Sequence, residues 1–355
     1  MGLAPPRDDR LPSWRRRPVR SRLVAYGRTA DNGRDHVKTL TATATLAVAA
    51  AALTGCGNVS FGTGEETRTY TAPAGITALK LTGNGSRVQV RATDTPTIKV
   101  VERLRWSNER NKPVAKRTTE GDTLTLAAKC ARATMGFTRC GVSYRVEVPR
   151  DLPVEIDNRD GSIDASGLAG TVKLHSHNGS IEATDLRATS ASIRSNDGSL
   201  RVSGRAATAD LDSSNGSIDA TGLTADRLTA RSRDGRIKVS GTIRTADLNT
   251  ANGSIDAAGL TAESVTAETR DGSVRLGFVS APTKVKAESA NGSIHVWLPS
   301  GESYAIDAST NNGGKRIDPS VHLDSASTRT IDLRTSDGSI TVTAGAHPVR
   351  DQRSW

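Results

Sequence analysis

Large side chains are scarce in this chain of 355 residues. Aromatic residues make up only 3% of it, and there are two Met. This composition argues against a bulky globular core, because such cores draw much of their buried area from large apolar side chains. Gly, Ser, Thr, Ala and Asp are plentiful instead, which favours thin elements that bury small and β-branched residues.

A concentrated basic charge is also missing from most of the chain. The formal net charge is +10, but residues 1–55 hold ten basic and four acidic residues. The remainder carries 38 basic and 34 acidic residues, which is close to balance. Nucleic-acid binding needs a concentrated basic face, so we expect no nucleic-acid partner.

The N-terminal region has the pattern of a secretory signal. Residues 37–56 read VKTLTATATLAVAAAALTGC, in which Lys38 precedes an uncharged run of Ala, Leu, Thr and Val. The run is too short and too rich in Thr and Ala for a permanent membrane helix. Residues 1–36 are Arg- and Pro-rich and long for a signal, so we expect translation to start at Val37. Residues 1–55 are therefore predicted to be a presequence.

The end of that run resembles the bacterial lipobox. It consists of Leu53, Thr54, Gly55 and Cys56. In proteins with this motif the peptide is cut before the Cys, and the thiol then carries lipid chains. Buried CH2 groups hold such a chain in a membrane at about 0.8 kcal/mol each. We predict that Cys56 is lipidated, that residues 56–69 are a tether, and that the protein is secreted and anchored at the outer face of the bacterial cytoplasmic membrane or cell surface.

Only two further cysteines are present, Cys130 and Cys140. Secretion places them in an oxidising setting, and we predict a disulfide between them. A zinc site is the alternative, but two Cys without a nearby His or a third Cys are a weak zinc signal.

A short phrase recurs along most of the chain, and SSNGSID at residues 213–219 is one version of it. Each copy places Asp or Asn before Gly. These residues are Asp160, Asn178, Asp197, Asn215, Asp234, Asn252, Asp271, Asn291 and Asp337. From Asp160 to Asn291 the steps are 18, 19, 18, 19, 18, 19 and 20 residues. A fixed short period is the mark of a solenoid.

Within each unit, apolar residues alternate with a period of two, as in strands. Around Asn215, for example, Leu211 precedes the corner and Ile218 follows it. The position of Ser213 is nearly always Ser or Thr, which predicts an inward column of hydroxyls that hydrogen-bond along the stack. Each unit is thus predicted to hold two short strands, with Gly at the corner between them.

Such units suit either an antiparallel meander of hairpins or a β-helix with one unit per coil. The outward position four residues after the Asp or Asn discriminates between them. From residue 182 it alternates in sign: Glu182, Arg201, Asp219, Lys238, Asp256 and Arg275. Stacked coils make these residues direct neighbours and turn repulsion into a ladder of ion pairs, whereas a meander leaves them two strands apart. We therefore predict an all-β fold, a parallel β-helix with coils of about 18–19 residues.

The regular repeats occupy residues 151–343. Residues 70–150 are rich in strand patterns without strict repetition, and we interpret them as irregular first coils with an insert closed by the disulfide. Such an end would cap the edge of the coils. Residues 344–355 are interpreted as a tail.

The lipobox, the irregular strand-rich start and the run of [DN]-G-S-I coils together resemble the bacterial putative adhesin family of β-strand-repeat proteins, a domain of unknown function. The resemblance covers roughly residues 70–343. It implies that the β-helix is right-handed and lies on the cell surface, and it brings no catalytic motif.

The Asp-Gly and Asn-Gly corners could also be chemical sites. Calcium-binding repeats need a Gly-Gly-x-Gly-x-Asp spacing, which the units lack. Four corners match N-x-S, but a bacterial lipoprotein usually lacks the glycosylation pathway that the acceptor requires. We interpret the corners as turns, because Asp and Asn tolerate turn geometry and Gly has no Cβ, and we expect no metal and no cofactor.

Other candidates for chemistry have structural explanations. Asp219, Lys238 and Asp256 could imitate the charged cluster of a polysaccharide-cleaving β-helix, but the charge ladder accounts for all three. His175 and His177 share a strand face and could pair on a metal, although solvated histidines are the simpler interpretation.

Sugar-binding surfaces usually present aromatic faces, and the candidates are Trp106, Trp297 and Tyr304. Structural packing explains each of them equally well. The sequence therefore favours a cell-surface lipoprotein without catalytic activity, an adhesin-like or envelope-scaffolding element whose partner is an envelope protein, surface protein or glycan. The alternative is a β-helix that binds or cleaves polysaccharide.

Overall fold

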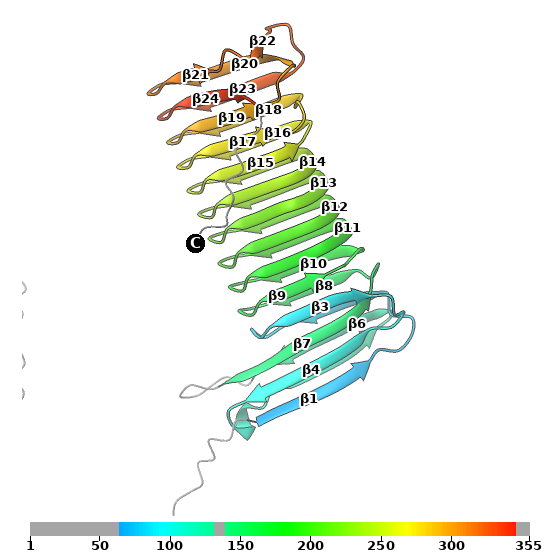
Figure 1. The fold of residues 1–355 in the computed structure, drawn as a ribbon. Coiled ribbons are helices and arrows are strands. Elements are labelled where there is room, and N and C mark those ends of the chain that lie inside the picture. The colour runs from blue at the N-terminus through cyan, green and yellow to red at the C-terminus, as the bar shows by residue number, and fades with distance from the viewer. Residues whose placement is uncertain (1–63, 131–138, 346–355) are drawn as a thin grey trace, which may run out of the picture. The chain divides into compact units, whose positions relative to one another are not determined.

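The structure is a computed structural model, and it describes residues 64–130 and 139–345 (Figure 1). The predicted presequence, Cys56 with its lipobox, and most of the predicted tail lie outside these residues. The described part forms one sheet of 24 strands. Its single helical element is the short 3-10 turn η1 (Glu109–Asn111), so the predicted all-β fold is confirmed.

The middle of the chain is a stack of parallel coils. Four long strands form its centre: β11 (Ile181–Ser195), β12 (Leu200–Ser213), β13 (Ile218–Ser232) and β14 (Ile237–Thr250). Each pairs in parallel with the next, one repeat further along the chain. Successive corners consequently lie in a row along one edge of the stack (Figure 1). This pairing confirms the parallel β-solenoid and excludes the meander of hairpins.

The stack continues on both sides of these four strands. Towards the N-terminus lie β8 (Val154–Asn158), β9 (Ile163–Ser166) and β10 (Thr171–Ser176). Towards the C-terminus lie β15 (Ile255–Thr261), β16 (Ser264–Thr269), β17 (Val274–Phe278), β18 (Lys284–Ser289) and β19 (Ile294–Leu298). All of them pair in parallel with the strands of neighbouring coils.

The central coils have three sides rather than the two that the repeat pattern predicts. In β11, the buried positions fall in three runs, within residues 181–183, 186–188 and 191–195. Each run alternates with period two, and the phase shifts at the bends between runs. We call the run before an Asp/Asn-Gly corner the first side, the run after it the second side, and the remaining run the third side. The third side was missed because it holds only two inward residues, here Leu186 and Ala188.

A bend between the second and third sides explains why coils of 19 and 18 residues alternate. The bend of each longer coil holds one residue more than that of a shorter coil, so the pairing shifts register by one residue there. Both kinds of bend use a residue with positive φ: Asp185 (φ 54°), Gly222 (φ 75°) and Gly259 (φ 68°) in the longer coils, and Gly167 (φ 72°), Gly204 (φ 107°) and Gly241 (φ 123°) in the shorter ones. A left-handed backbone is costly for residues with a Cβ, which explains the glycines at this bend.

The core consists of columns of like residues. The position three after the corner Asp or Asn is fully buried in every regular coil. This column is Ile163, Ile181, Leu200, Ile218, Ile237, Ile255, Val274, Ile294 and Ile340. Burying an aliphatic side chain of this size stabilises the fold by about 1.5–3 kcal/mol, so the repetition of modest residues replaces a few large aromatic ones.

The N-terminal end contains antiparallel strands. The coil of β2 (Ala78–Thr82) and β3 (Val88–Thr93) pairs in parallel with β8 and β9. On its other face lie β6 (Thr123–Lys129) and β7 (Cys140–Pro149). Three more strands run antiparallel against these two or each other: β1 (Gly64–Thr71), β4 (Lys99–Trp106) and β5 (Val114–Glu120).

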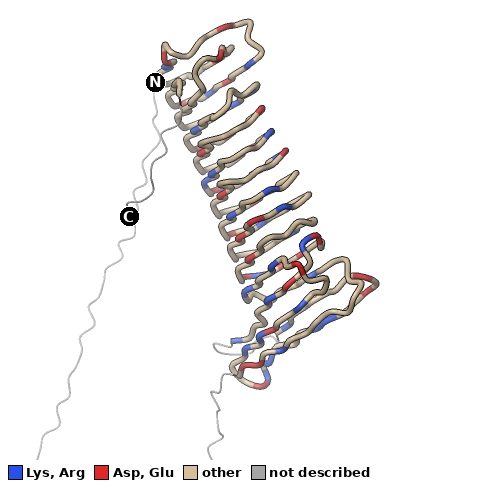
Figure 2. The backbone as a smooth tube through the Cα atoms, turned by 45° about the vertical axis from the view of Figure 1, so that its right-hand side comes forward, with Lys and Arg blue, Asp and Glu red and all other residues tan. Residues whose placement is uncertain are grey.

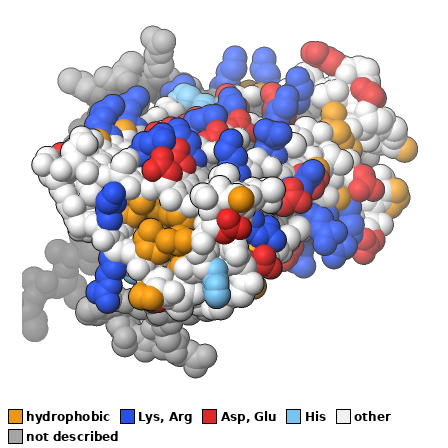
Figure 3. Space-filling model, turned by 90° about the horizontal axis from the view of Figure 1, so that it is seen from above, with side chains coloured by type: hydrophobic (Ala, Val, Ile, Leu, Met, Phe, Trp, Pro, Cys, Tyr) orange, Lys and Arg blue, Asp and Glu red, His pale blue; other side chains and the backbone are white. Residues whose placement is uncertain are grey.

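The C-terminal end has an exchanged order of coils. The coil of β18 and β19 pairs with β23 (Thr330–Thr335) and β24 (Ile340–Ala344). These pair in turn with β20 (Ser303–Thr310) and β21 (Lys315–Ile317), which come earlier in the chain. A short strand, β22 (His322–Leu323), pairs with the start of β20. Viewed from above, this end shows a gathered group of apolar side chains (Figure 3).

Candidate functional site

The predicted corner residues lie in one column along the stack, where glycine is required by close contact. A Cβ added to Gly216 would lie 2.1 Å from the carbonyl oxygen of Gly198 in the preceding coil. Ser213, the predicted inward hydroxyl, accepts a hydrogen bond from the Gly216 N–H at 3.0 Å and donates to Gly198 O at 3.2 Å. The hydroxyls of this column therefore form hydrogen bonds with the backbone of the corners and not with one another.

Asp and Asn alternate strictly along the corner column. Each Asn side chain donates from Nδ2 to the carboxylate of the Asp in an adjacent coil. The pairs are Asn178 with Asp160, Asn215 with Asp197, Asn252 with Asp234, Asn291 with Asp271, and Asn312 with Asp337. An amide between carboxylates supplies a donor and avoids stacking like charges. The corners thus have a structural use for both residue types.

The predicted charge column is present, but most of its oppositely charged neighbours do not approach closely enough to form ion pairs. The register places Glu182, Arg201 and Asp219 on adjacent strands, and opposite charges alternate along the stack (Figure 2). Among the described residues of this column from 182 onward, only Arg201 and Glu182 approach as an ion pair, at 3.9 Å. Asp219 instead accepts hydrogen bonds from the hydroxyl and the N–H of Thr221.

Closer ion pairs form on the first side of the coils. Arg194 lies 2.9 Å from Asp210 of the next coil, and Arg231 lies 3.5 Å from Asp247. Each pair is diagonal, because the two partners belong to different outward columns. Exposed pairs of this kind stabilise by about 0–1 kcal/mol each.

The three candidate aromatic residues do not form a sugar-binding platform. Trp106 is 6% exposed and donates from Nε1 to Glu109, Trp297 is 8% exposed and stacks on His295, and Tyr304 is 1% exposed. The two candidate histidines, His175 and His177, have ring centroids 4.9 Å apart. No group of three or more His, Cys, Asp or Glu residues suited to a metal ion occurs among the described residues.

Cys130 and Cys140 form a disulfide, the pairing predicted from the sequence. It joins the end of β6 to the start of β7. Nearby, Glu102 on β4 is completely buried and receives two hydrogen bonds from Arg117, at 3.1 and 3.2 Å. Burial, and secondarily the charge of Glu102, raises the pKa of the Tyr144 hydroxyl.

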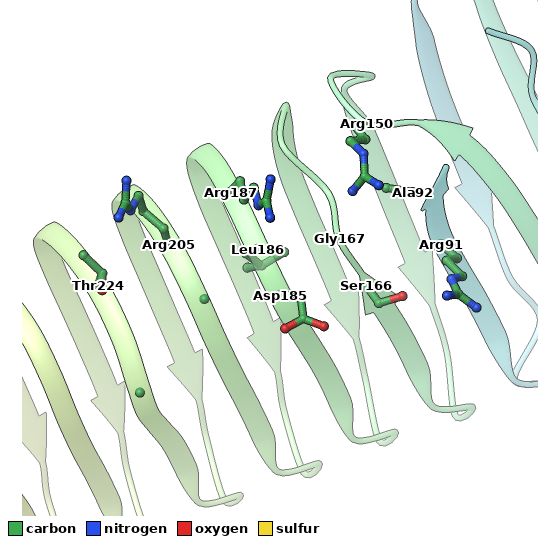
Figure 4. A pocket seen from close by; sticks show the side chains of 12 residues that line it. Arg91, Ala92, Arg150, Ser166, Gly167, Asp185, Leu186, Arg187, Arg205 and Thr224 are labelled. Atoms are coloured by element: carbon green, nitrogen blue, oxygen red, sulfur yellow. The ribbon is translucent and has the colours of Figure 1, made fainter. Parts of the chain in front are cut away.

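The third side carries a groove that the sequence analysis did not identify. It has a volume of about 1030 Å³, and its lining includes Arg91, Arg150, Arg187 and Arg205. The acidic residue in its lining is Asp185. Arg187 and Arg205 project from successive turns of the chain, and the turn that carries Gly167 separates them from Arg150 (Figure 4). The signal in the sequence was the 18-residue spacing of Arg187 and Arg205, but it has a meaning only once the third side is known.

Within the described residues, only one of these arginines has an ion-pair partner. Arg150 lies 2.7 Å from Asp94, and its guanidinium holds the pKa of that carboxyl below the ordinary value. Arg187 and Arg205 make no hydrogen bond or ion pair with any residue that the structure describes. With four arginines and one aspartate in its lining, the groove is electropositive and open to an anion.

A search of curated proteins gives no match. Among solved structures, the chain is similar to a putative adhesin from Bacteroides fragilis, with 13% identity, 79% of this chain and 97% of that chain covered, and a TM-score of 0.41. It is also similar to a putative cell adhesion protein from Clostridium sporogenes, with 10% identity, 79% and 100% covered, and a TM-score of 0.23. A putative adhesin from Parabacteroides merdae has 12% identity, 78% and 95% covered, and a TM-score of 0.40.

Comparison with protein families gives a match to Toastrack DUF4097 over residues 76–243 and again over residues 207–343. Together the two matches span most of the chain and include the coils, the corner column and the groove on the third side. The chain belongs to the Toastrack DUF4097 family.

Proposed function

We propose that this protein is a lipid-anchored cell-surface element without catalytic activity, which acts as an adhesin-like or scaffolding protein of the bacterial envelope. The observation that carries the proposal is the continuous stack of coils, in which the repeated residues serve the stacking itself. Asp219, for example, is satisfied by Thr221 on its own strand. A stack of this kind is a rigid platform whose function depends on the surface it presents.

Anchoring is the part of the proposal that rests on the sequence. Among the described residues, no helix is long and apolar enough to cross a membrane, and the lipobox ending at Cys56 supplies the proposed attachment. We expect Cys56→Ala to move the protein from the membrane fraction to a soluble or uncut precursor fraction. Membrane retention of the processed protein in this variant would contradict the anchor.

Surface exposure is tested separately on intact cells. Added protease should degrade the wild-type protein while a cytoplasmic marker remains intact, because the proposed anchor leaves the stack outside the membrane. Full protection until the cells are lysed would contradict the surface location, whatever the fate of the Cys56→Ala variant.

The alternative is a polysaccharide-cleaving β-helix, and its candidate carboxylates are Asp219 and Asp256. We expect no release of reducing ends when the purified protein is incubated with cell-wall polysaccharides. Release of sugar that is abolished by Asp219→Asn or Asp256→Asn, but not by Glu182→Gln in the same column, would establish the enzymatic alternative.

A further inference from the structure

The outward column of the third side departs from the charge pattern of the other sides. Arg187 and Arg205 are direct register partners on β11 and β12. Neighbouring strands lie about 4.8 Å apart, and like charges directly opposite each other destabilise a sheet. The second side alternates its charges, and the first side pairs them diagonally. The third side therefore holds an arginine pair that works against its own fold.

No residue that the structure describes compensates this repulsion. Neither arginine has an ion-pair or hydrogen-bond partner in the described residues. Asp185 lies two residues before Arg187 in the same groove lining, yet it forms no ion pair with either arginine. An external anion between the two guanidinium groups would replace their repulsion with charge-assisted hydrogen bonds, which guanidinium forms well with carboxylate and phosphate.

The groove continues along the stack beyond the two arginines. The same outward column proceeds in register to Thr224, Thr242 and Thr261. A second cavity of about 570 Å³ shares Arg205 and Thr224 with the first. Its lining is otherwise mostly threonine, alanine and serine side chains, with an ion pair between Asp226 and Arg244 and one further carboxylate, Glu263. The anion site thus opens into a channel of hydroxyls and methyl groups that runs across successive coils.

This arrangement fits a long ligand better than a small ion. Sugar hydroxyls can exchange hydrogen bonds with the threonine column, while an anionic group sits at the arginine pair. Nucleic acid is disfavoured, because single strands are usually held by base stacking on aromatic side chains, and neither cavity has an aromatic residue in its lining.

We propose that the third-side groove binds an anionic polysaccharide, a glycan polymer whose repeating units carry carboxylate or phosphate groups. Arg187 and Arg205 hold one anionic group together, and the threonine column contacts the neighbouring sugars. The inference deepens the proposed function, because it names the ligand chemistry of a surface protein.

Binding of fluorescently labelled polymers to the purified full-length protein tests the proposal. The probes are polygalacturonate for carboxylate, poly(glycerol phosphate) for phosphate, and dextran as a neutral glycan. We expect at least one anionic polymer to bind, dextran not to bind, and the double variant Arg187→Gln/Arg205→Gln to weaken binding at least tenfold. Equal binding of dextran, or no binding of either anionic polymer, would overturn the proposal.

The matched control is Arg194→Gln/Arg231→Gln, which also removes two positive charges, but from the first side of the stack. Because those arginines already have Asp partners, this variant should bind nearly as well as the wild type. An equal loss of affinity in both double variants would show diffuse charge attraction and would overturn the groove as the binding site. Tighter binding of single-stranded DNA than of any glycan would also overturn it.

Two further measurements separate polymer binding from simpler explanations. Inorganic phosphate should compete only at concentrations at least tenfold above those of the polymer's repeating unit, and equal competition would reduce the site to a free-anion site. Without ligand, the double variant Arg187→Gln/Arg205→Gln should be at least as stable as the wild type, because the substitutions relieve repulsion. A loss of stability would assign the arginines a structural role instead.

The outcomes also distinguish this inference from the proposed function. If the protein is protease-accessible on cells but binds no polymer, this inference alone is refuted. If it binds a polymer but is not surface-exposed, the proposed function alone is refuted.

Discussion

The N-terminal end and the central coils are stabilised in different ways. The central coils repeat one set of small interactions: a buried aliphatic residue, a corner glycine and a hydroxyl bonded to the corner backbone. The N-terminal end uses interactions that occur once, among them the disulfide and the buried pair of Glu102 and Arg117. A repeated interaction spreads stability over many coils, whereas a single one concentrates it in a few residues. Substitutions in the two regions can compare how much each kind of interaction contributes to stability.

The largest effect is expected at the buried ion pair of the N-terminal end. Arg117→Met leaves the carboxylate of Glu102 buried without its partner, which typically costs about 3–5 kcal/mol in the free energy of unfolding. Lys116→Met is the matched control, because the neighbouring Lys116 is exposed. Urea denaturation of both variants gives the comparison, and equal stability of the two would show that the pair contributes little.

The next effect is expected at a corner of the central coils. Gly216→Ala places a methyl group against the backbone of the preceding coil, where no side chain can move aside. Overpacking typically costs about 1–3 kcal/mol, and we expect the upper end of that range. Gly222→Ala in the same coil is the control, since its Cβ meets nothing within 4 Å and only the φ of 75° is unfavourable. A larger loss in the control would mean that turn conformation, and not close stacking, selects glycine at the corners.

A smaller effect is expected from Ser213→Ala. The substitution leaves the buried N–H of Gly216 without its acceptor, and an unsatisfied buried group costs about 1–3 kcal/mol. Since the change is a simple truncation, the lower half of that range is expected from urea denaturation. Ser217→Ala removes an exposed hydroxyl two residues after the corner Asn215 and should have almost no effect.

The smallest effect concerns pH and the N-terminal end. Hydrogen bonds from Arg68 and then Lys112 lower the pKa of Glu66 from 4.5 to about 2. A lowered pKa in the folded state means that the stabilisation is present above about pH 4.5 and is lost as pH falls towards 2. An NMR titration should place the midpoint of Glu66 near 2, and Lys112→Ala should raise it. A midpoint near 4.5 in the wild type would contradict the two contacts.

The same contrast explains what could be predicted from the sequence. The repetition made the coils predictable from the sequence, because Ile218 and its equivalents recur at a period that only stacking explains. The third side escaped prediction, since a short run with two inward residues is masked by the phase shifts at its bends. The exchanged order of the last two coils escaped as well, because Asp337 and Asn312 have similar local sequences and only long-range pairing distinguishes their places. The pairing of Glu102 with Arg117 joins β4 to β5, and such single contacts leave no periodic signal.

The alternation of corners and bends has a consequence for how proteins of this design can change in length. Asn215 and Asn252 are 37 residues apart, as are Asp197 and Asp234, so the true structural unit is a pair of coils. Duplication or loss of one coil would place two carboxylates or two amides against each other and mismatch the bends at the new junction. Duplication or loss of two coils preserves both the alternation of Asp and Asn and the match of the bends at the junction. Growth of the stack is therefore expected in steps of two coils, each step lengthening the surface by about 10 Å.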